Sequence, residues 1–442
     1  MERTLINDTI NKTDEKTRVC AWVFSRRDHG KIVFFDLKDR SGILQAVAMA
    51  NIVESDIREG YILDITGTIQ KRPEKLVNPE MPTGSIEMQI EEIKIISKAE
   101  VYPFTIKEMD VNYPVLMDFR PLTLRNDKIK SIFKVQENLI DGFRKTLKGL
   151  DFTEFQTPAI VGQAPEGGSE LFHIDYYDYN AYLAQSPQIY KQILTGVYER
   201  VFTVCKAFRA EPSATTRHLS EYISLDAEMG FIQSWEDVME VCEKTIKGMM
   251  QNVTDNCLAD LKLHNAQIPD LTIAIPKIKL REAQEIVGAD KNEPDLSPED
   301  ERNICQWAKE KYNSDFIFVT HFPTKKRPFY THPDPEDLEH TLGFDLLFRG
   351  LEIITGGQRI NDYEQLVSNI KKWGNKEEDF SFYLQTFKFG MPPEGGFAIG
   401  TERVTKQLLG LDNVGEASLF PRDMERIDQR LSDVQTKKSK KE

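Results

Sequence analysis

The chain has 442 residues, of which 40% are hydrophobic and 29% charged, and its formal net charge is −14. This length leaves room for two or three domains, and no apolar run reaches the ~20 residues that a membrane helix needs. The acidic charge argues against a protein that simply coats nucleic acid, although it permits a local basic face. The N-terminus is too polar for a signal peptide, and the five cysteines include no CxxC pair, so we expect a cytoplasmic protein without a zinc site.

Residues 1–100 predict a small β domain. Five β-prone segments, separated by turn signals, are Arg18–Phe24, Ile32–Leu37, Leu44–Ala48, Ile62–Ile69 and Ile86–Ile96. Five such strands are typical of an OB-fold barrel, which commonly binds single-stranded nucleic acid on one face. A different small barrel is the alternative. Strand alternation puts Phe34 and Phe35 on opposite faces, so one of the two is expected in the core.

Residues 101–124 contain three prolines and no sustained periodicity, which predicts a hinge between domains. A helical stripe of apolar residues begins near Asn126, which can cap the helix, and Gly149 marks its expected end. The remainder, residues 125–435, predicts a second domain of α+β class. Within it, residues 255–315 alternate polar turns with short helical pieces and are expected to be an insertion without chemistry. Residues 436–442 form a basic tail, for which a solvated end is favoured over an RNA contact.

The stretch from Val201 to Phe231 predicts two strands joined by a polar loop. Its ionisable residues are Arg209, Glu211, Arg217 and His218. Arginine forms paired, charge-assisted hydrogen bonds with phosphates, so this hairpin suits a nucleoside triphosphate. One arginine can meet the α-phosphate, Glu211 can accept from an adenine amine, and Arg217 with His218 can meet the γ-phosphate. A solvated hairpin with scattered charges is the alternative interpretation.

Three further patterns carry candidate chemistry. In AYLAQSPQIYKQ, which starts at Ala181, Lys191 lies among Gln and Ser and can hold a substrate carboxylate. A predicted strand ends at Glu352 and is followed by Thr355, and a carboxylate with a hydroxyl suits Mg²⁺ beside phosphates. Arg403 falls in the first turn of a predicted helix, where a cation opposes the helix dipole, and this placement indicates a bound anion. A surface ion pair between Glu352 and Arg359 is the alternative for that strand end.

The wording and order of these segments resemble the class II aminoacyl-tRNA synthetases. The long helix, strand and Pro158 resemble motif 1, FRAE followed by TRHL resembles motif 2, and GGFAIGTERVTKQLLG resembles motif 3. KIVFFDLKDRSGILQAV (residues 31–47) resembles the anticodon-binding OB domain of the aspartyl, asparaginyl and lysyl members. QSPQIYKQ and GGQR resemble the aspartyl type, in its archaeal or eukaryotic form.

The resemblance implies a catalytic domain built on an antiparallel sheet flanked by helices. It also implies a homodimer that activates L-aspartate with ATP and Mg²⁺ and transfers it from aspartyl-adenylate to tRNA. Arg209 and Arg403 match catalytic positions. The implied aspartate-binding residues are Glu166, Gln188, Lys191, Arg209, Thr355 and Arg359. The implied ATP-binding residues are Arg209, Glu211, Arg217, His218, Leu219, Glu352, Gly400, Thr401, Glu402 and Arg403. Glu352 and Thr355 match metal ligands, and Arg27, Phe34 and Gln45 match anticodon-binding positions.

Three positions depart from the family pattern: Pro212 follows RAE, Thr355 replaces a serine, and Ala398 replaces a glycine. The sequence leaves open whether tRNA(Asn) is charged in addition to tRNA(Asp). An asparagine–tRNA ligase is one alternative, and Lys191 argues against it because a cation prefers a carboxylate to an amide. A non-catalytic RNA-binding relative is the other, and the presence of Arg209, Arg359 and Arg403 together argues against it.

Overall fold

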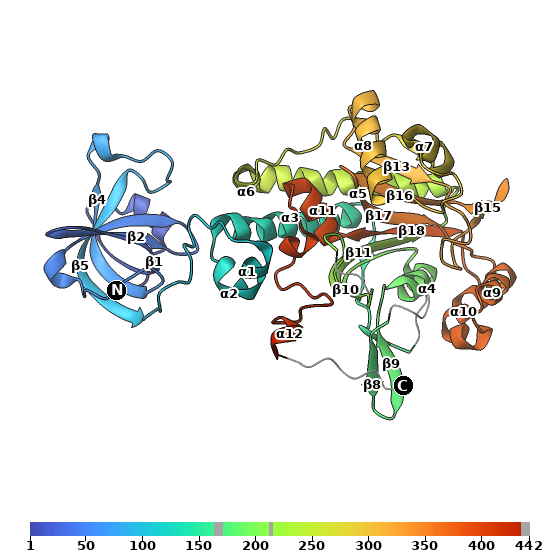
Figure 1. The fold of residues 1–442 in the computed structure, drawn as a ribbon, viewed down its shortest axis with the longest axis horizontal. Coiled ribbons are helices and arrows are strands. Elements are labelled where there is room, and N and C mark those ends of the chain that lie inside the picture. Colours follow the sequence, from blue (N-terminus) through green and yellow to red (C-terminus); the bar gives the residue numbers. More distant parts are fainter. Residues whose placement is uncertain (163–170, 212–214, 435–442) are drawn as a thin grey trace. The chain divides into compact units, whose positions relative to one another are not determined.

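Two units, Met1–Asp110 and Val111–Glu442, make up the computed structural model, which describes residues 1–162, 171–211 and 215–434 (Figure 1). No helix among these described residues has the length and apolar character needed to cross a membrane. The predicted hinge, residues 101–124, ends in two short helices, α1 (Tyr113–Asp118) and α2 (Arg120–Thr123), which belong to the second unit.

The first unit is a closed five-stranded barrel with the order β1-β2-β3-β5-β4, which confirms the predicted OB fold. The strands are β1 (Lys16–His29), β2 (Ile32–Lys38), β3 (Ile43–Met49), β4 (Ile62–Lys71) and β5 (Ile86–Ser97). Buried and more exposed residues alternate along β2, so Phe35 lies in the core while Phe34 stays partly exposed on the outer face. The expectation that only one of these phenylalanines is a core residue is therefore confirmed. Short 3₁₀ helices lie at Ile6–Asn11, Ala50–Ile52 and Glu74–Leu76.

An eight-stranded mixed sheet, in the order β12-β13-β16-β17-β18-β11-β10-β6, forms the centre of the second unit. Its strands are β6 (Thr153–Glu154), β10 (Arg200–Phe208), β11 (Glu221–Gly230), β12 (Lys277–Lys279), β13 (Phe316–Thr320), β16 (Gly343–Phe348), β17 (Leu351–Gln358) and β18 (Glu394–Gly400). The six inner strands pair with one another in antiparallel fashion, and each edge strand, β12 or β6, pairs in parallel with its inner neighbour. An antiparallel sheet flanked by helices is thus confirmed, with parallel additions at its margins.

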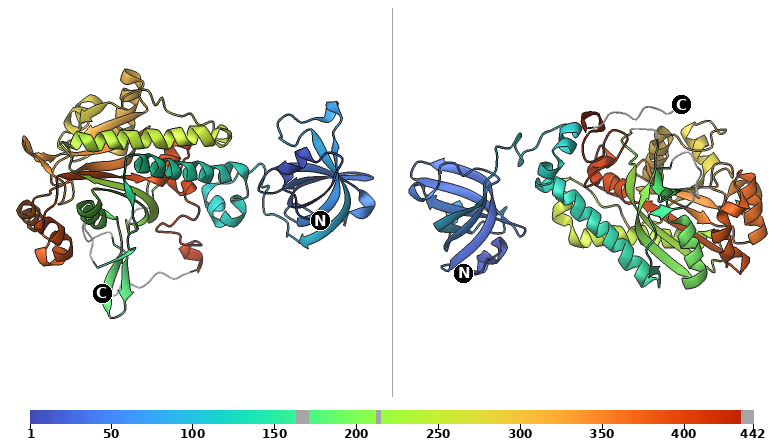
Figure 2. Two further views of the ribbon diagram at one scale, coloured as in Figure 1. Left: turned by 180° about the vertical axis from the view of Figure 1, so that it is seen from behind. Right: turned by 90° about the horizontal axis from the view of Figure 1, so that it is seen from below.

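Besides α1 and α2, the second unit contains further helices in addition to this sheet. They are α3 (Asp127–Gly149), α4 (Gln188–Tyr198), α5 (Trp235–Asn256), α6 (Leu258–Leu263), α7 (Leu280–Val287), α8 (Pro298–Tyr312), α9 (Tyr363–Lys372), α10 (Ser381–Lys388), α11 (Thr401–Leu409) and α12 (Leu431–Val434), with 3₁₀ turns at Glu377–Phe380 and Val414–Ala417. Helix α3 begins as predicted, because the Asn126 side chain accepts a hydrogen bond from the Ile129 amide. Figure 2 shows α3 and α5 lying side by side across one face of the sheet.

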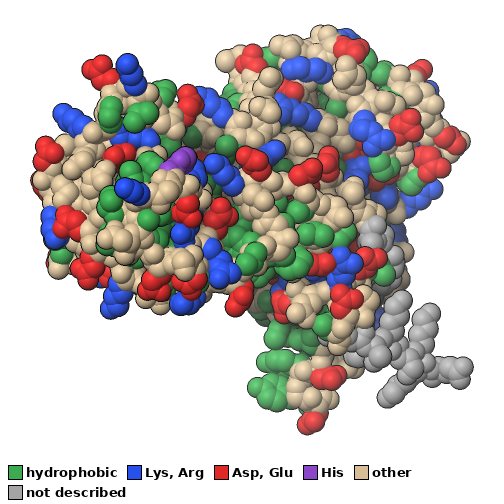
Figure 3. Space-filling model, turned by 60° about the vertical axis from the view of Figure 1, so that its left-hand side comes forward, with side chains coloured by type: hydrophobic (Ala, Val, Ile, Leu, Met, Phe, Trp, Pro, Cys, Tyr) green, Lys and Arg blue, Asp and Glu red, His purple; other side chains and the backbone are tan. Residues whose placement is uncertain are grey.

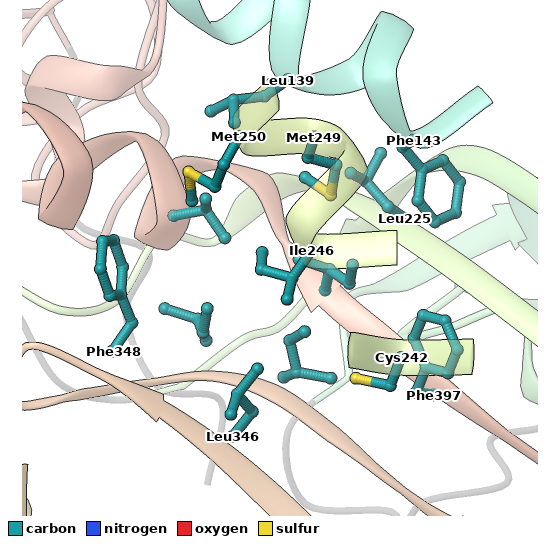
Figure 4. Close-up of a cluster of buried hydrophobic side chains, with 14 of the residues drawn as sticks. Leu139, Phe143, Leu225, Cys242, Ile246, Met249, Met250, Leu346, Phe348 and Phe397 are labelled. Atoms are coloured by element: carbon teal, nitrogen blue, oxygen red, sulfur yellow. The ribbon is translucent and has the colours of Figure 1, made fainter. Parts of the chain in front are cut away.

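The main core lies between this helix pair and the sheet. Figure 4 shows Leu139 and Phe143 of α3 directed toward Ile246 and Met249 of α5, and Phe397 of β18 lies beneath α5. Each of these five side chains is 1% exposed or less. Burial on this scale stabilises each by about 1.5–3 kcal/mol relative to exposure, so one face of the sheet is anchored and the other remains for a site.

Two small sheets complete the unit. One pairs β14 (Pro333–Asp334) with β15 (Asp337–Thr341), and the other has the order β7-β9-β8, formed by Ile160–Val161, Tyr179–Leu183 and His173–Tyr176. The β8–β9 hairpin exposes Tyr177 and Tyr179, and Figure 3 shows hydrophobic side chains gathered on this projecting segment. Residues 255–315, expected to be an insertion, supply α6, α7, α8 and the edge strand β12, so they are integrated into the sheet.

Candidate active site

A polar cavity lies where the β10–β11 hairpin, β17, β18 and the start of α11 meet. Its lining includes Arg209, Glu211, Arg217, His218, Leu219, Tyr222, Glu352, Thr355, Ala398, Gly400, Glu402 and Arg403. Strand register brings these distant segments together, because Asp226 pairs with Ala398, Ala398 with Thr355, and Thr355 with Asp345 across four strands. Of the residues predicted to bind ATP, Thr401 is not in this lining; it is fully buried in the first turn of α11.

The hairpin end of the cavity holds loosely paired charges. The Arg209 amide donates to the Ser220 carbonyl at 2.9 Å, which fixes the mouth of the hairpin. The Arg209 guanidinium lies 3.7 Å from Glu211 and 5.6 Å from the centre of the Tyr222 ring. His218 Nε2 lies 3.6 Å from the other Glu211 oxygen, and burial lowers the pKa of His218, which favours its neutral form.

Arg403, in the first turn of α11, faces the start of β17, because Glu352 is the second residue of this strand and not the predicted strand end. Arg403 Nη1 donates to the Glu352 carbonyl oxygen at 3.1 Å and lies 3.4 Å from the Glu352 carboxylate. Burial acts to raise the pKa of Glu352, but the guanidinium groups of Arg403, Arg327 and Arg209 outweigh burial and lower it. Glu352 is therefore an ionised carboxylate beside the guanidinium groups of these arginines. Arg403, at the start of α11, thus lies next to an anionic side chain.

Glu301 of α8 was missed by sequence reasoning and lies at the same end. Its carboxylate contacts the Arg217 guanidinium and accepts the Glu352 amide at 3.2 Å. Burial raises the pKa of Glu301 to about 7 even though Arg217 opposes the shift. The capping box of Ser297 and Asp300 marks the start of α8 in the sequence, but no local signal connects Glu301 with Arg217, 84 residues away.

Thr355 contributes its hydroxyl to a compact polar row. It accepts from Arg327 Nη1 at 2.7 Å and donates to the Asp345 carboxylate, which also receives Arg327 Nη2 at 2.7 Å. Burial raises the pKa of Asp345 to about 6. The described residues contain no cluster of three or more His, Cys, Asp or Glu side chains poised around one ion. Glu352, Asp345 and Thr355 offer hard oxygen donors, which fit Mg²⁺ when nucleotide phosphates supply the remaining ligands.

A buried charge cluster lies next to the polar cavity along β11, where Asp226 pairs with the lining residue Ala398, and its four charged residues are not part of the lining. Lys191 Nζ lies 3.0 Å from both Asp226 and Glu228, and Glu228 also binds Arg359 Nε at 2.7 Å. Arg359 Nη2 donates to the Gly396 carbonyl at 3.0 Å. All four charged side chains are at most 6% exposed. The two predicted cations, Lys191 and Arg359, are thus brought together by a carboxylate that the sequence did not single out.

Opposite charges dominate the titration of this cluster. Burial acts to lower the pKa of Lys191, but Glu228 and Asp226 outweigh it and raise that pKa. Burial acts to raise the pKa of Glu228, but Arg359 and Lys191 lower it. Lys191 and Glu228 are therefore both charged. A Cβ atom at position 396 would collide with Glu228, so only glycine there leaves room for the cluster.

A neutral hydrogen-bonded chain lies beside these charges. Gln188 donates to Gln192 at 2.9 Å, Gln192 donates to Glu394 at 2.7 Å, and Tyr383 donates to Gln192 at 3.0 Å. Burial, with Glu228 nearby, raises the pKa of Glu394 well above its usual range, which makes it a neutral acid. Gln188, predicted to bind substrate, is 4% exposed and anchors the start of α4.

Comparison with known proteins identifies the family. The profile described as tRNA synthetases class II (D, K and N) matches residues 112–424, and the OB-fold nucleic acid binding domain profile matches residues 17–96. The chain belongs to the class II tRNA synthetases. The chain is 42% identical to the aspartate–tRNA(Asp/Asn) ligases of Deinococcus radiodurans (97% of this chain, 99% of that one) and Thermus thermophilus (96% and 99%).

Solved synthetase structures agree with this assignment. Asparaginyl-tRNA synthetase from Pyrococcus horikoshii, complexed with asparaginyl-adenylate, has a TM-score of 0.88 at 29% identity and covers 97% of this chain and 99% of its own. A putative aspartyl-tRNA synthetase from Leishmania major has a TM-score of 0.85 at 28% identity, with coverage of 96% and 95%.

The predicted anticodon residues of this synthetase lie on adjacent barrel strands. Arg27 pairs with Phe34 across β1 and β2, and Gln45 pairs with Asp36 across β2 and β3. Arg27 Nη2 binds Asp36 at 2.9 Å, and the Gln45 amide donates to Glu87 at 3.1 Å. The three residues are brought together, and their anticodon roles stay predictions.

Two predicted contacts of the synthetase fall on residues that the structure does not describe. Glu166, predicted near the substrate ammonium, and Pro212, the departure in motif 2, both lie outside the described ranges. Ala398 does line the cavity, one strand from Thr355. Its methyl group therefore faces the space in which a nucleotide would lie.

Proposed function

We propose that this synthetase is an aspartate–tRNA ligase that forms aspartyl-adenylate from L-aspartate and ATP and transfers it to tRNA. The buried cluster in which Glu228 holds both Lys191 and Arg359 is the observation that carries the proposal. Glu228 and the Gly396 carbonyl hold Nε and Nη2 of Arg359, and Nη1 makes no hydrogen bond to any described residue. A guanidinium edge beside an ammonium suits a side-chain carboxylate better than an amide. The names of the relatives that are 42% identical support the same amino acid.

The chemistry asks mainly for positioning and charge neutralisation. The α-carboxylate of aspartate attacks the α-phosphorus of ATP, the bond to the bridging oxygen breaks, and pyrophosphate leaves. Arg209 and Arg403 both line the cavity and offset charge on the phosphates. Glu211 accepts from the adenine amine, and Arg217 and His218 face the terminal phosphate. A ribose hydroxyl at the 3′ end of tRNA then attacks the adenylate carbonyl, and AMP leaves.

Mg²⁺ would be held by Glu352, Asp345 and Thr355 together with phosphate oxygens, and when bound it would neutralise phosphate charge. Asp345 is an addition to the predicted pair, since its carboxylate already contacts the Thr355 hydroxyl. Burial and the neighbouring Glu352 raise the pKa of Asp345 although Arg327 and Thr355 bind its carboxylate, and a bound cation would favour the ionised form.

The barrel supplies tRNA recognition in this proposal. Phe34 is partly exposed on the outer strand face, where an aromatic ring can stack an unpaired base. Gln45 can read a base edge and Arg27 can hold the backbone. A homodimer is proposed through the segment after α3, because Pro158 and Ile160 are exposed beside the edge strand β6. The free cysteines fit a cytoplasmic compartment.

Amino-acid-dependent ATP–pyrophosphate exchange, with Mg²⁺ and with aspartate or asparagine in separate reactions, tests the proposal. We expect exchange with aspartate and none above background with asparagine. Exchange with asparagine alone would assign the asparagine–tRNA activity, as in the Pyrococcus horikoshii neighbour. Absence of exchange with either amino acid, after addition of tRNA, would indicate an RNA-binding protein. Charging of purified tRNA(Asp) and tRNA(Asn) transcripts then decides the tRNA range.

A further inference from the structure

A second cavity, lined by residues other than those of the active-site cavity, lies between α7, α9, β15 and the loop that follows β13. Its volume is about 680 Å³, within the range of small-molecule sites, and it shares no lining residue with the active-site cavity. Figure 1 shows β15 and α9 at the same end of the second unit, on the side away from α3. None of the chemistry proposed above uses this cavity.

The lining is cationic, although the whole chain carries a net charge of −14. Arg281 of α7, Lys325 of the loop and Lys372 of α9 contribute three cations, and Glu339 is the one lining carboxylate. Lys325 and Lys372 are exposed and have no ion pair with a described residue. Arg281 bonds the Gln284 side chain at 2.8 Å and the Glu293 carbonyl at 2.9 Å, and no carboxylate in the described chain neutralises it. The lining therefore favours an anion.

Two further side chains shape the cavity. His340 is oriented by Asp337, whose carboxylate lies 2.7 Å from its Nδ1, and its buried Nε2 has no hydrogen-bond partner in the described structure. An orphan ring nitrogen of this kind marks a place for a polar ligand atom. Trp373, at the end of α9, lines the same cavity and is 40% exposed, so one ring surface is available for stacking.

We propose that this cavity binds a nucleoside phosphate as a second nucleotide site. The phosphates lie against Lys325, Lys372 and Arg281, and the base stacks on Trp373. A concave cavity of this volume suits a mononucleotide rather than an extended polyanion, and an aromatic wall beside three cations matches a ligand with both a planar ring and phosphates. The inference goes beyond the proposed ligase activity, because it concerns residues outside the active site.

Equilibrium dialysis with labelled ATP and Mg²⁺, without amino acid or tRNA, measures the number of sites. We expect two ATP molecules per wild-type chain and one in the double variant Lys325→Glu and Lys372→Glu. Both lysines are exposed, so the variant folds, and its aspartate-dependent exchange should stay within twofold of wild type. The matched control Lys262→Glu and Lys388→Glu changes the net charge equally at exposed lysines outside both cavities and should retain two sites. A single site in wild type, or two sites in the first variant, would overturn the proposal.

Trp373→Leu separates ring recognition from charge. At the second site, this variant should bind ATP roughly tenfold more weakly, because stacking on the indole is lost. Inorganic pyrophosphate has no ring, so its affinity for that site should stay within twofold. Equal weakening of both ligands, or of neither, would contradict stacking by the nucleoside. Loss of ATP–pyrophosphate exchange in wild type would be a failure of the ligase proposal alone, since the dialysis needs no turnover.

Discussion

The two parts of the proposed active site hold charge in different ways. The buried charge cluster, proposed to bind the amino acid, is called the amino-acid end, and the polar cavity, proposed to bind ATP, is called the nucleotide end. At the amino-acid end, Lys191, Arg359, Asp226 and Glu228 are almost fully buried, and their ion pairs measure 2.7–3.0 Å. At the nucleotide end, Arg209 and Arg403 are 39% and 23% exposed, and their ion pairs with Glu211 and Glu352 measure 3.7 and 3.4 Å. Tight burial favours one fixed geometry, whereas half-exposed, loosely held cations can turn toward an incoming phosphate.

The difference follows from where each group sits on the sheet. Asp226 and Glu228 lie on β11, covered by α4 and β18, so every charge there needs a partner to offset its desolvation. Arg209 and Arg403 lie at the ends of a strand and a helix, where solvent screens them. The amino-acid end is therefore expected to govern stability and substrate choice, and the nucleotide end to govern rate.

The largest effect is expected from Glu228→Ala. Removing this carboxylate leaves Arg359 buried without its ionic partner and takes one of two carboxylates from Lys191. The free energy of unfolding of the catalytic unit should fall by about 3–5 kcal/mol, as for a broken buried ion pair. Urea denaturation measures the change. Glu240→Ala, which breaks the exposed pair with Lys244, is the control and should cost no more than about 0.5 kcal/mol. Equal losses of unfolding free energy in the two variants would contradict the proposed difference between buried and exposed ion pairs.

Arg403→Ala should show the opposite balance. We expect aspartate-dependent exchange to fall by about 10²–10³-fold, because a charge that stabilises the reacting phosphates is lost. The free energy of unfolding should change by less than about 1 kcal/mol, since the partner Glu352 is reached at 3.4 Å at a half-exposed position. Steady-state exchange and urea denaturation on the same preparation give both numbers. A large loss of unfolding free energy with normal exchange would contradict the expectation that the nucleotide end governs the reaction rate.

The pH dependence of the free energy of unfolding tests the role of Glu301 at the nucleotide end. Burial raises its pKa from an ordinary 4.5 to about 7, so the folded state binds the proton more tightly than the unfolded state. The contribution of protonated Glu301 to the free energy of unfolding is fully present below pH 4.5 and is lost as the pH rises through 7. Relative to Glu301→Gln, which cannot ionise, wild type should lose roughly 2–3 kcal/mol of unfolding free energy between pH 5 and 8. Glu299→Gln on the same helix is exposed and should track wild type.

Glu211→Gln should give the smallest effect. Glutamine keeps a carbonyl oxygen that can accept from the adenine amine, but the charge that faces Arg209 and His218 is removed. One weakened hydrogen bond is worth about 0.5–1.5 kcal/mol, so the KM for ATP should rise roughly two- to tenfold while the KM for aspartate stays unchanged. Exchange kinetics at varied ATP and varied aspartate provide the test. A matching rise in the KM for aspartate would mean that the two ends are coupled.

Local sequence signals predicted the elements that hold the site. The β-branched and aromatic residues of Val201–Phe208 predicted β10, and the apolar stripe from Asn126 to Gly149 predicted α3 with its cap. Both depend on neighbours within a few residues, since strand alternation and helix capping are local effects. Arg403 was found in the same way, because a cation at a helix start conflicts with the dipole within one turn.

Contacts that cross the chain were decided by tertiary structure. Glu301 contacts Arg217 because α8 packs beside β17, and Asp345 contacts Thr355 because the two are paired in the sheet. Glu228 of β11 binds both Lys191 of α4 and Arg359, which follows β17. An acidic residue on a buried strand looks the same in sequence whether its partner is solvent or a cation from another element. The sequence by itself therefore determined the family and the barrel, and it predicted many of the residues that line the polar cavity. Burial and pairing of those charges, which depend on sheet register and helix packing, were decided only by the folded chain.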